Sequence, residues 1–116
     1  MEIRFENKVA FITGAAGGIG YAAARMFAEA GASVVMADLD SRVTDRAKEL
    51  EAEGHNAIGI RCDVSDEAQV KAAVEKAVAV FGKLDIAYNN VGIHAAVRED
   101  LAKTEGWDFD YVISVN

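Results

Sequence analysis

Four glycines that separate an apolar run from a helical pattern constrain this chain more than any other feature. Residues 13–20 read T-G-A-A-G-G-I-G and follow the apolar residues 9–12 directly. The glycines leave backbone N–H groups unshielded by side chains, and the helix behind them directs its partial positive N-terminus back at the turn. A dinucleotide pyrophosphate is the usual anion in such a turn. Glycines also make ordinary loops, so the strand–turn–helix context carries this interpretation.

Length and composition indicate a globular protein. The 116 residues are enough for one domain or for part of a larger one. Hydrophobic residues make up 52%, and no apolar run approaches the length that spans a membrane. The first residues lack the apolar core of a secretory signal, and the single cysteine, Cys62, fits a reducing compartment. The net charge of −7 repels nucleic acid. We therefore expect a soluble, cytoplasmic protein that contacts neither nucleic acid nor membrane.

Short apolar runs alternate with amphipathic segments along the chain. Four buried strands are predicted at residues 8–13, 33–38, 57–62 and 84–88. Three intervening helices are indicated by apolar residues at helical spacing, which are Ile19, Ala23, Met26, Phe27 and Ala30, then Val43, Ala47 and Leu50, then Val70, Val74, Ala77, Val78 and Phe81. Glycines at 31, 54 and 82 end these helices, and Ser65 is the expected N-cap of the third. Residues 104–116 predict the opening of a fourth helix. This alternation is typical of an α/β fold with a parallel sheet covered on both faces.

An acidic residue, Asp38, ends the second predicted strand. It follows the glycine turn at about the distance where a dinucleotide-binding unit places the carboxylate that accepts hydrogen bonds from the adenosine ribose. A carboxylate there repels a 2′-phosphate, so Asp38 favours NAD over NADP. Asp40 is a nearby rival for this role, and Asp38 could instead cap a helix or lie in a solvated loop. Neither Gly17 nor Leu39 supplies a base for a 2′-phosphate, but Arg42 is near enough to keep NADP open.

Four motifs in order resemble those of the short-chain dehydrogenases/reductases. Thr13-Gly-x-x-x-Gly-Ile-Gly20 is similar to the cofactor motif of that family, and Asp63-Val64 is similar to the pair placed beside the adenine ring. Asn89-Asn90-Val91-Gly92 resembles its Asn-Asn-Ala-Gly motif, with Val91 in place of the usual alanine. Residues 107–115, closing on Asn116, resemble the helix that carries the catalytic asparagine. The general G-x-G-x-x-G/A fingerprint also fits residues 18–23, but its first glycine there comes too late for the turn at the strand end.

The resemblance implies a Rossmann-type doubly wound parallel sheet, of which the chain supplies the first four strands in the order 3-2-1-4. It implies a single NAD-binding half-domain over residues 1–116 with no internal boundary. The cofactor-binding residues are then expected to be Gly14, Gly17, Gly18, Ile19, Gly20, Asp38, Leu39, Asp63, Val64, Asn90, Val91 and Gly92. Asn116 is the expected catalytic residue, which holds a water in a proton relay. Structural alternatives stay open at several of these positions: Gly14 as the tight turn alone, Gly20 as room for close packing of helix and strand, Asp63 as the cap of the next helix or turn, and Asn90 as a bond between strand ends.

The catalytic pair of the family, Tyr-x-x-x-Lys, is absent from these 116 residues. The residues four positions after Tyr21, Tyr88 and Tyr111 are Arg25, Gly92 and Val115. We therefore expect the N-terminal part of an NAD(H)-dependent oxidoreductase, inactive by itself, whose parent moves hydride between nicotinamide and a small alcohol or ketone. The resemblance also implies a homo-oligomer, and a bare edge on the fourth strand predicts self-association.

Other classes of function have weaker support in the sequence. A non-catalytic dinucleotide-binding sensor or interaction module would share the glycine turn and Asp38 but would need no Tyr-x-x-x-Lys pair. The phosphate-loop motif G-x-x-x-x-G-K-[ST] does not occur. His55, His94 and Cys62 lack the local spacing of metal ligands, so we expect no metal site. Cys62 is expected to pack at the end of the third strand.

Overall fold

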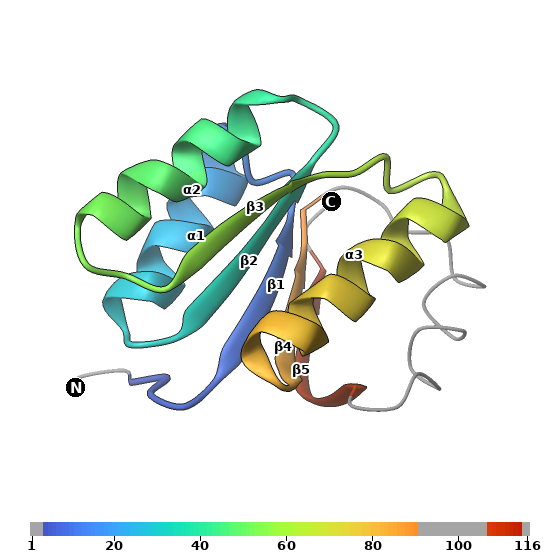
Figure 1. Ribbon diagram of the computed structural model, residues 1–116. Coiled ribbons are helices and arrows are strands. Elements are labelled where there is room, and N and C mark those ends of the chain that lie inside the picture. The colour runs from blue at the N-terminus through green and yellow to red at the C-terminus, as the bar shows by residue number, and fades with distance from the viewer. Residues whose placement is uncertain (1–3, 91–106, 115–116) are drawn as a thin grey trace.

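The chain folds into a parallel β-sheet with helices on both faces (Figure 1). The computed structural model describes residues 4–90 and the strand at 107–114. The elements in chain order are β1 (Val9–Thr13), α1 (Gly18–Glu29), β2 (Ser33–Asp38), α2 (Arg42–Ala52), β3 (Ala57–Arg61), α3 (Glu67–Phe81), β4 (Leu84–Asn89) and β5 (Trp107–Ser114). The strands lie in the order β3-β2-β1-β4-β5, and each neighbouring pair is parallel. The predicted doubly wound sheet and the order 3-2-1-4 of its first four strands are confirmed.

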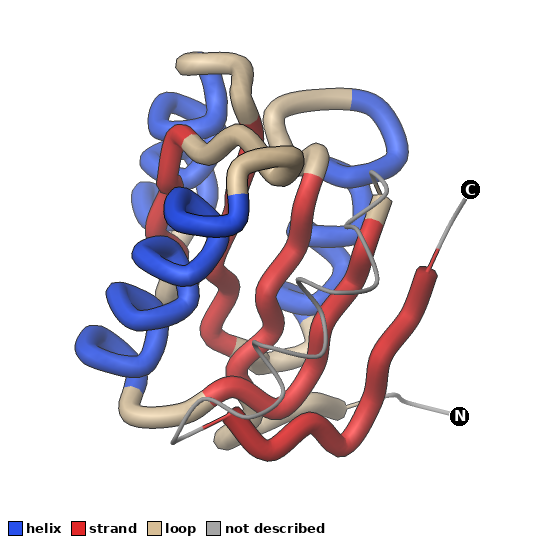
Figure 2. Tube along the Cα trace, turned by 90° about the vertical axis from the view of Figure 1, so that its right-hand side faces the viewer, coloured by secondary structure: helices blue, strands red, loops and turns tan. Residues whose placement is uncertain are grey.

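The central strands are continuously apolar because helices cover both of their faces. All five residues of β1 are buried. Successive side chains of a strand point to opposite faces of the sheet. Ala10 and Ile12 accordingly pack with residues of α1 and α2, whereas Val9 and Phe11 pack with residues of α3. Figure 2 shows the strands between these two helical layers. The two cores therefore account for the uninterrupted apolar runs in the sequence.

The buried face of α1 agrees with the prediction at Ala23 and Phe27 and differs from it at Ile19 and Met26. Ile19 and Met26 are 62% and 53% exposed, whereas Ala24, Phe27 and Ala28 are buried. The rotation of the helix is set by Gly20, because a Cβ on Gly20 would lie 1.8 Å from the carbonyl oxygen of Gly14. Residues four, seven and eight positions after Gly20 then face the sheet, and Ile19 and Met26 lie on the flank. The predicted faces of α2 and α3 are buried except at Val78 and Phe81, which are half-buried.

Close packing also fixes the position of α2. A Cβ on Gly59 of β3 would lie 2.7 Å from the carbonyl oxygen of Val43 and 2.8 Å from the Cα atom of Thr44. The missing side chain therefore lets the backbone of α2 lie directly against β3. The three helices end as predicted, because Gly31, Gly54 and Gly82 have φ angles of 101°, 97° and 85°.

The N-cap of α3 is Asp66 and not the predicted Ser65. The Asp66 carboxylate accepts hydrogen bonds from the N–H groups of Ala68 and Gln69 at 3.0 and 3.4 Å. Ser65 is engaged elsewhere, because its hydroxyl donates to Asp63 Oδ1 at 2.6 Å. The hydroxyl of Ser65 is thus bound to Asp63 and does not cap α3. The helix therefore begins one residue later than expected.

The predicted fourth helix at residues 104–116 is wrong over residues 107–114, which form β5. This strand pairs in parallel with β4, with one irregularity between Leu84 and Ile86. Its sequence, W-D-F-D-Y-V-I-S, alternates over its first five residues and is rich in aromatic and β-branched residues, as strands are. The edge of β4 also offers N–H and C=O groups that need partners. The bare edge predicted for the fourth strand is therefore wrong too, and the predicted self-association loses that basis.

A buried carboxylate joins β1 to β4 near the amino-terminal ends of these strands, whereas the glycine turn follows the carboxyl end of β1. Asp85 is 7% exposed, and its Oδ2 atom accepts a hydrogen bond from the Val9 N–H at 2.8 Å. Lys83 Nζ lies 3.2 Å from the same oxygen. The bond therefore satisfies a buried N–H group at the start of β1, where it would otherwise be costly.

Replacing Asp85 by alanine is expected to lower the free energy of unfolding by about 2 kcal/mol, because the buried Val9 N–H loses its acceptor. Asp85→Asn keeps an oxygen that can accept this bond, so its cost should be about half as large. Urea denaturation of both variants at neutral pH measures the difference. Equal destabilisation by the two substitutions would contradict the role given to the hydrogen bond.

Candidate functional site

The predicted site residues of three strands lie together at one edge of the sheet. The strands β1, β2 and β4 are parallel, so their carboxyl ends meet there. Ala15 N–H donates to the carbonyl oxygen of Ala37 at 3.2 Å, which ties the glycine turn to β2. Asn90 N–H donates to Thr13 Oγ1 at 3.0 Å, which ties the loop after β4 to the end of β1. Ligands of open α/β sheets bind at this edge.

Three of the four glycines in the turn are required by its backbone. Gly14 and Gly18 have φ angles of 65° and 59°, a region that side chains disfavour. Gly20 has no room for a Cβ, which would also lie 3.1 Å from Asn90 Nδ2. Gly17 differs, because its φ of −169° suits any residue and no atom of the described residues lies within 4 Å of a Cβ there. The turn is therefore closed on the side of Gly20 and open at Gly17.

Among the residues that the structure describes, no side chain caps the N-terminus of α1. Its first turn also holds no acidic residue. The other two described helices are served by the chain itself: Asp40 Oδ1 accepts from Arg42 N–H at the start of α2, and Asp66 caps α3. The first N–H groups of a helix need acceptors and carry a partial positive charge. At α1 this acceptor can be an external anion.

Asp38 holds the glycine turn and keeps capacity for a further ligand. Its Oδ2 atom accepts from the Ala16 N–H and its Oδ1 atom from the Asp40 N–H, both at 2.9 Å. Two carboxylate oxygens offer about four acceptor positions, so two of them remain available. Asp38 is half-buried at the end of β2, as the sequence predicts.

The rival carboxylate, Asp40, is already paired. Arg42 donates from Nε and Nη2 to Asp40 Oδ2 at 2.9 and 2.7 Å. These bonds hold the pKa of Asp40 below its usual value. Arg42 is the residue that could have bound the 2′-phosphate of NADP. Its guanidinium is instead bound to the carboxylate of Asp40, two residues earlier in the chain. Asp38 is the acidic side chain that touches the turn.

Sequence reasoning missed the role of Thr13 and Asn89 in placing the loop after β4. Both residues are buried, and Thr13 Oγ1 donates to Asn89 Oδ1 at 3.0 Å while it accepts from the N–H of Asn90. One hydroxyl therefore connects the ends of β1 and β4. A polar residue at the end of an otherwise apolar strand was the available signal, because a buried hydroxyl needs partners.

The remaining predicted positions differ in what the structure describes. Asp63 forms the turn that was its structural alternative, since its Oδ1 accepts from the N–H and hydroxyl of Ser65, and these bonds lower its pKa. Cys62 is buried, and burial raises the pKa of its thiol. Val64 is half-buried. Leu39 is 56% exposed beside Asp38. Four candidate site residues from the sequence lie outside the described residues: Val91, Gly92, His94 and Asn116.

Within the part of the chain that the structure describes, no three His, Cys, Asp or Glu side chains are arranged to hold a metal ion. The described helices include none that is long and apolar enough to cross a membrane.

Gly20→Ala is expected to lower the free energy of unfolding by about 2–3 kcal/mol, because the new Cβ collides with backbone atoms that cannot move aside. Gly17→Ala is the matched control in the same turn and should lower stability by at most about 1 kcal/mol, because Gly17 is the N-cap of α1 but has room for a Cβ. Thermal or urea unfolding of the two variants gives the comparison. Equal stability of the two variants would refute the close contact between Gly20 and Gly14.

Known proteins resemble this chain in sequence. The family model described as short chain dehydrogenase matches residues 8–116. A borneol dehydrogenase, mitochondrial, from Lavandula x intermedia is 45% identical over 114 residues, which are 97% of this chain and 42% of that protein. The cis-4-hydroxycyclohexanecarboxylate dehydrogenase of Sinomonas cyclohexanicum is 47% identical over 89 residues, 77% of this chain and 36% of that protein. The chain thus spans about two fifths of the length of these curated relatives.

Solved structures show the same architecture. A hydroxysteroid dehydrogenase from Escherichia coli matches with a TM-score of 0.75 and 39% identity, over 78% of this chain and 38% of that one. A short chain dehydrogenase/reductase from Burkholderia phymatum in complex with NAD matches with a TM-score of 0.74 and 42% identity, over 78% of this chain and 32% of that one. Together with the family match over residues 8–116, these likenesses establish that the chain belongs to the short chain dehydrogenase family.

Proposed function

We propose that this chain is the cofactor-binding part of an NAD(H)-dependent short-chain dehydrogenase/reductase. The observation that supports it most is the hydrogen bond from the Ala16 N–H to Asp38 Oδ2, which joins the glycine turn to the carboxylate at the end of β2. A dinucleotide requires both features at once, because its pyrophosphate binds a glycine turn and its adenosine ribose binds an acidic side chain. The open space at Gly17 and Gly18 fits close approach of a pyrophosphate to the backbone.

Each proposed residue has a chemical role in cofactor binding. The turn from Gly14 to Gly20 and the N-terminus of α1 bind the pyrophosphate through N–H groups. Asp38 accepts hydrogen bonds from the adenosine ribose with the acceptor positions that Ala16 and Asp40 leave available. The family resemblance assigns the rest: Ile19 to the pyrophosphate together with the glycines of the turn, Leu39 to the cofactor, Asp63 and Val64 to the adenine, Asn90, Val91 and Gly92 to the inner ribose, and Asn116 to the proton relay.

NAD is the proposed cofactor in preference to NADP. The charge of Asp38 would face a 2′-phosphate directly, and like charges at close range repel. Arg42 offers little compensation, because its guanidinium is already bound to Asp40. The Burkholderia relative was solved with NAD.

The oxidoreductase activity is proposed for the whole protein. When bound, NAD supplies the acceptor or donor of a hydride, and the substrate would be an alcohol or a ketone. The relatives described above are dehydrogenases by name, and the chain matches about two fifths of their length. The residues described here would bind and orient the cofactor at the carboxyl edge of the sheet.

Isothermal titration calorimetry of the chain with NAD and with NADP tests the cofactor proposal. We expect NAD to bind at least tenfold more tightly than NADP, which corresponds to about 1.4 kcal/mol. Asp38→Asn removes the negative charge and keeps nearly the same shape. It should lower the ratio of the NADP to the NAD dissociation constant about tenfold. Asp45→Asn, on the exposed face of α2, removes a charge without contacting the turn and should leave the ratio unchanged.

Equal or tighter binding of NADP by the unaltered chain would contradict the role of Asp38. An unchanged ratio in Asp38→Asn would show that another group discriminates against the 2′-phosphate.

A further inference from the structure

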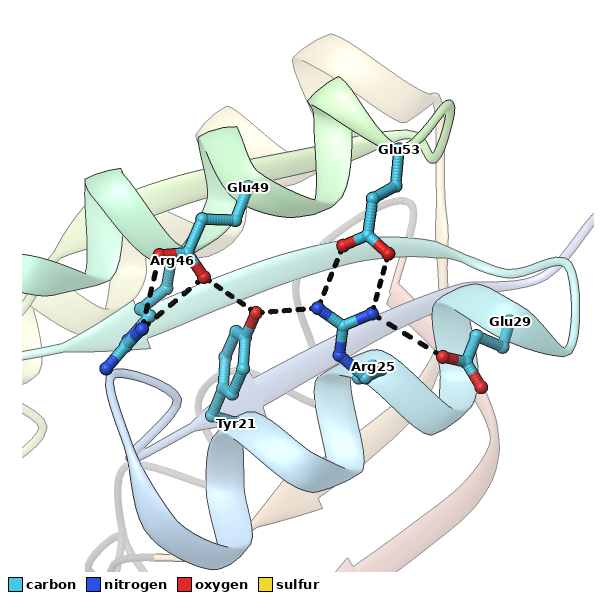
Figure 3. Close-up of polar contacts among 6 residues, drawn as sticks. All are labelled: Tyr21, Arg25, Glu29, Arg46, Glu49 and Glu53. Carbon is cyan, nitrogen blue, oxygen red and sulfur yellow. Dashed lines mark hydrogen bonds and ion pairs between the residues drawn. The ribbon is translucent and has the colours of Figure 1, made fainter.

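Polar side chains connect α1 to α2 on the outer side of the glycine turn (Figure 3). We call them the interhelix network, whose members are Tyr21, Arg25, Glu29, Arg46, Glu49 and Glu53. Arg25 donates from Nη1 and Nη2 to the two carboxylate oxygens of Glu53 at 2.9 and 2.8 Å. Its Nη2 also donates to the hydroxyl of Tyr21 at 3.0 Å. The Tyr21-x-x-x-Arg25 spacing, similar to the family's catalytic pair, therefore serves to join two helices.

Arg46 is held in place by this network. The Tyr21 hydroxyl donates to Glu49 Oε2 at 2.9 Å, and Arg46 Nη1 donates to Glu49 Oε1 at 3.2 Å. The guanidinium of Arg46 also lies over the Tyr21 ring, 5.1 Å from its centroid. A cation over an aromatic ring is attracted to its face. Glu49 and the Tyr21 ring thus both restrict the guanidinium of Arg46.

Another nitrogen of Arg46, Nε, contacts the glycine turn. Nε donates to the carbonyl oxygen of Ala16 at 3.1 Å. Ala16 is only 2% exposed, so its backbone groups need partners inside the protein. Its N–H donates to Asp38, and its C=O accepts from Arg46. The residue is therefore held from both sides by charged side chains of two different elements.

This contact also orients the N–H group of Gly17. The peptide bond between Ala16 and Gly17 is trans, as are all described peptide bonds. In a planar trans peptide the C=O and N–H groups point in opposite directions. When Arg46 draws the Ala16 carbonyl toward α2, the Gly17 N–H must point away from α2.

We propose that Arg46 is a positioning residue of the glycine turn, which fixes the Ala16–Gly17 peptide so that the turn presents an N–H group and not a carbonyl oxygen to a pyrophosphate. This role rests on the proposed binding of NAD. A reversed peptide would place a partial negative charge in the anion site, where it would repel the phosphate. Arg46 acts through the backbone of the turn and is not proposed to contact the cofactor.

Arg46→Met tests the role, because methionine keeps much of the side-chain length and removes every donor. Calorimetry would measure its affinity for ADP and for adenosine, which lacks the phosphates. We expect ADP to bind about tenfold more weakly than to the unaltered chain and adenosine to bind within about twofold, since one charge-assisted hydrogen bond positions the turn. The amide signal of Gly17 in NMR spectra of the ligand-free variant should also shift.

Lys48→Met is the matched control, because it removes the same charge from an exposed position of α2. It should leave ADP affinity unchanged at 0.1 M salt. The loss in Arg46→Met should also persist at 0.5 M salt, where the charge effect of an exposed group is largely screened. Thermal unfolding of both variants checks that the fold is retained.

Unchanged ADP affinity in Arg46→Met would overturn the proposal, as would equal losses of ADP and adenosine or a loss that disappears at high salt. If the unaltered chain binds neither ADP nor NAD, the proposed function is wrong. The Gly17 amide of the ligand-free variants then decides the positioning role by itself: an unmoved signal in Arg46→Met rejects it.

Discussion

The contact of Gly20 with the carbonyl group of Gly14 governs the arrangement of the site. A Cβ on Gly20 would lie 1.8 Å from the carbonyl oxygen of Gly14, so the first turn of α1 packs directly against the backbone there and the rotation of the helix is fixed. That rotation buries Ala24 and Phe27 against the sheet and exposes Ile19. The same contact places the N-terminus of α1 next to the turn, where its uncapped N–H groups are available. Packing and proposed binding therefore share one structural cause.

Polar contacts also hold the glycine turn in place, in addition to the close packing at Gly20. The buried Ala16 receives one partner from the end of β2 and one from α2. Asp38 consequently has two roles, because the oxygen pair proposed to bind a ribose also holds the turn. The position of α2 depends in turn on Gly59, which lets its backbone lie against β3. Changes far from the proposed cofactor can thus act on the turn through the sheet.

Most of the fold could be predicted from the sequence because its signals are local. Continuous apolar runs marked β1 and β2, and glycines marked the ends of three helices. The helical face of α1 was predicted less well, since the contact that sets its rotation is between Gly20 and another segment. The strand β5 was missed because the resemblance to the family favoured a helix there, although residues 107–111 alternate as a strand does. Its pairing with the edge of β4 could not be predicted, because β4 lies elsewhere in the chain.

The candidate site also contains residues that could be predicted from the sequence and residues that could not. Asp38 could be predicted because its distance along the chain from the glycine turn is nearly constant in dinucleotide-binding units. The contribution of Arg46 could not, because its contact with Ala16 spans thirty residues and depends on how α1 and α2 pack. Thr13 and Asn89 likewise meet only when β1 and β4 are neighbours. Spacing along the chain identifies the proposed ligand contacts, whereas tertiary packing selects the residues that hold them.

An NMR titration of the ¹⁵N-labelled chain with inorganic pyrophosphate tests most directly whether the glycine turn is an anion site. The amide signals of Gly17 to Gly20 are predicted to move most. Those of Ala68 and Gln69 at the start of α3 should stay in place, because Asp66 already accepts their hydrogen bonds. Equal movement at both helix starts, or no movement in the turn, would contradict the account.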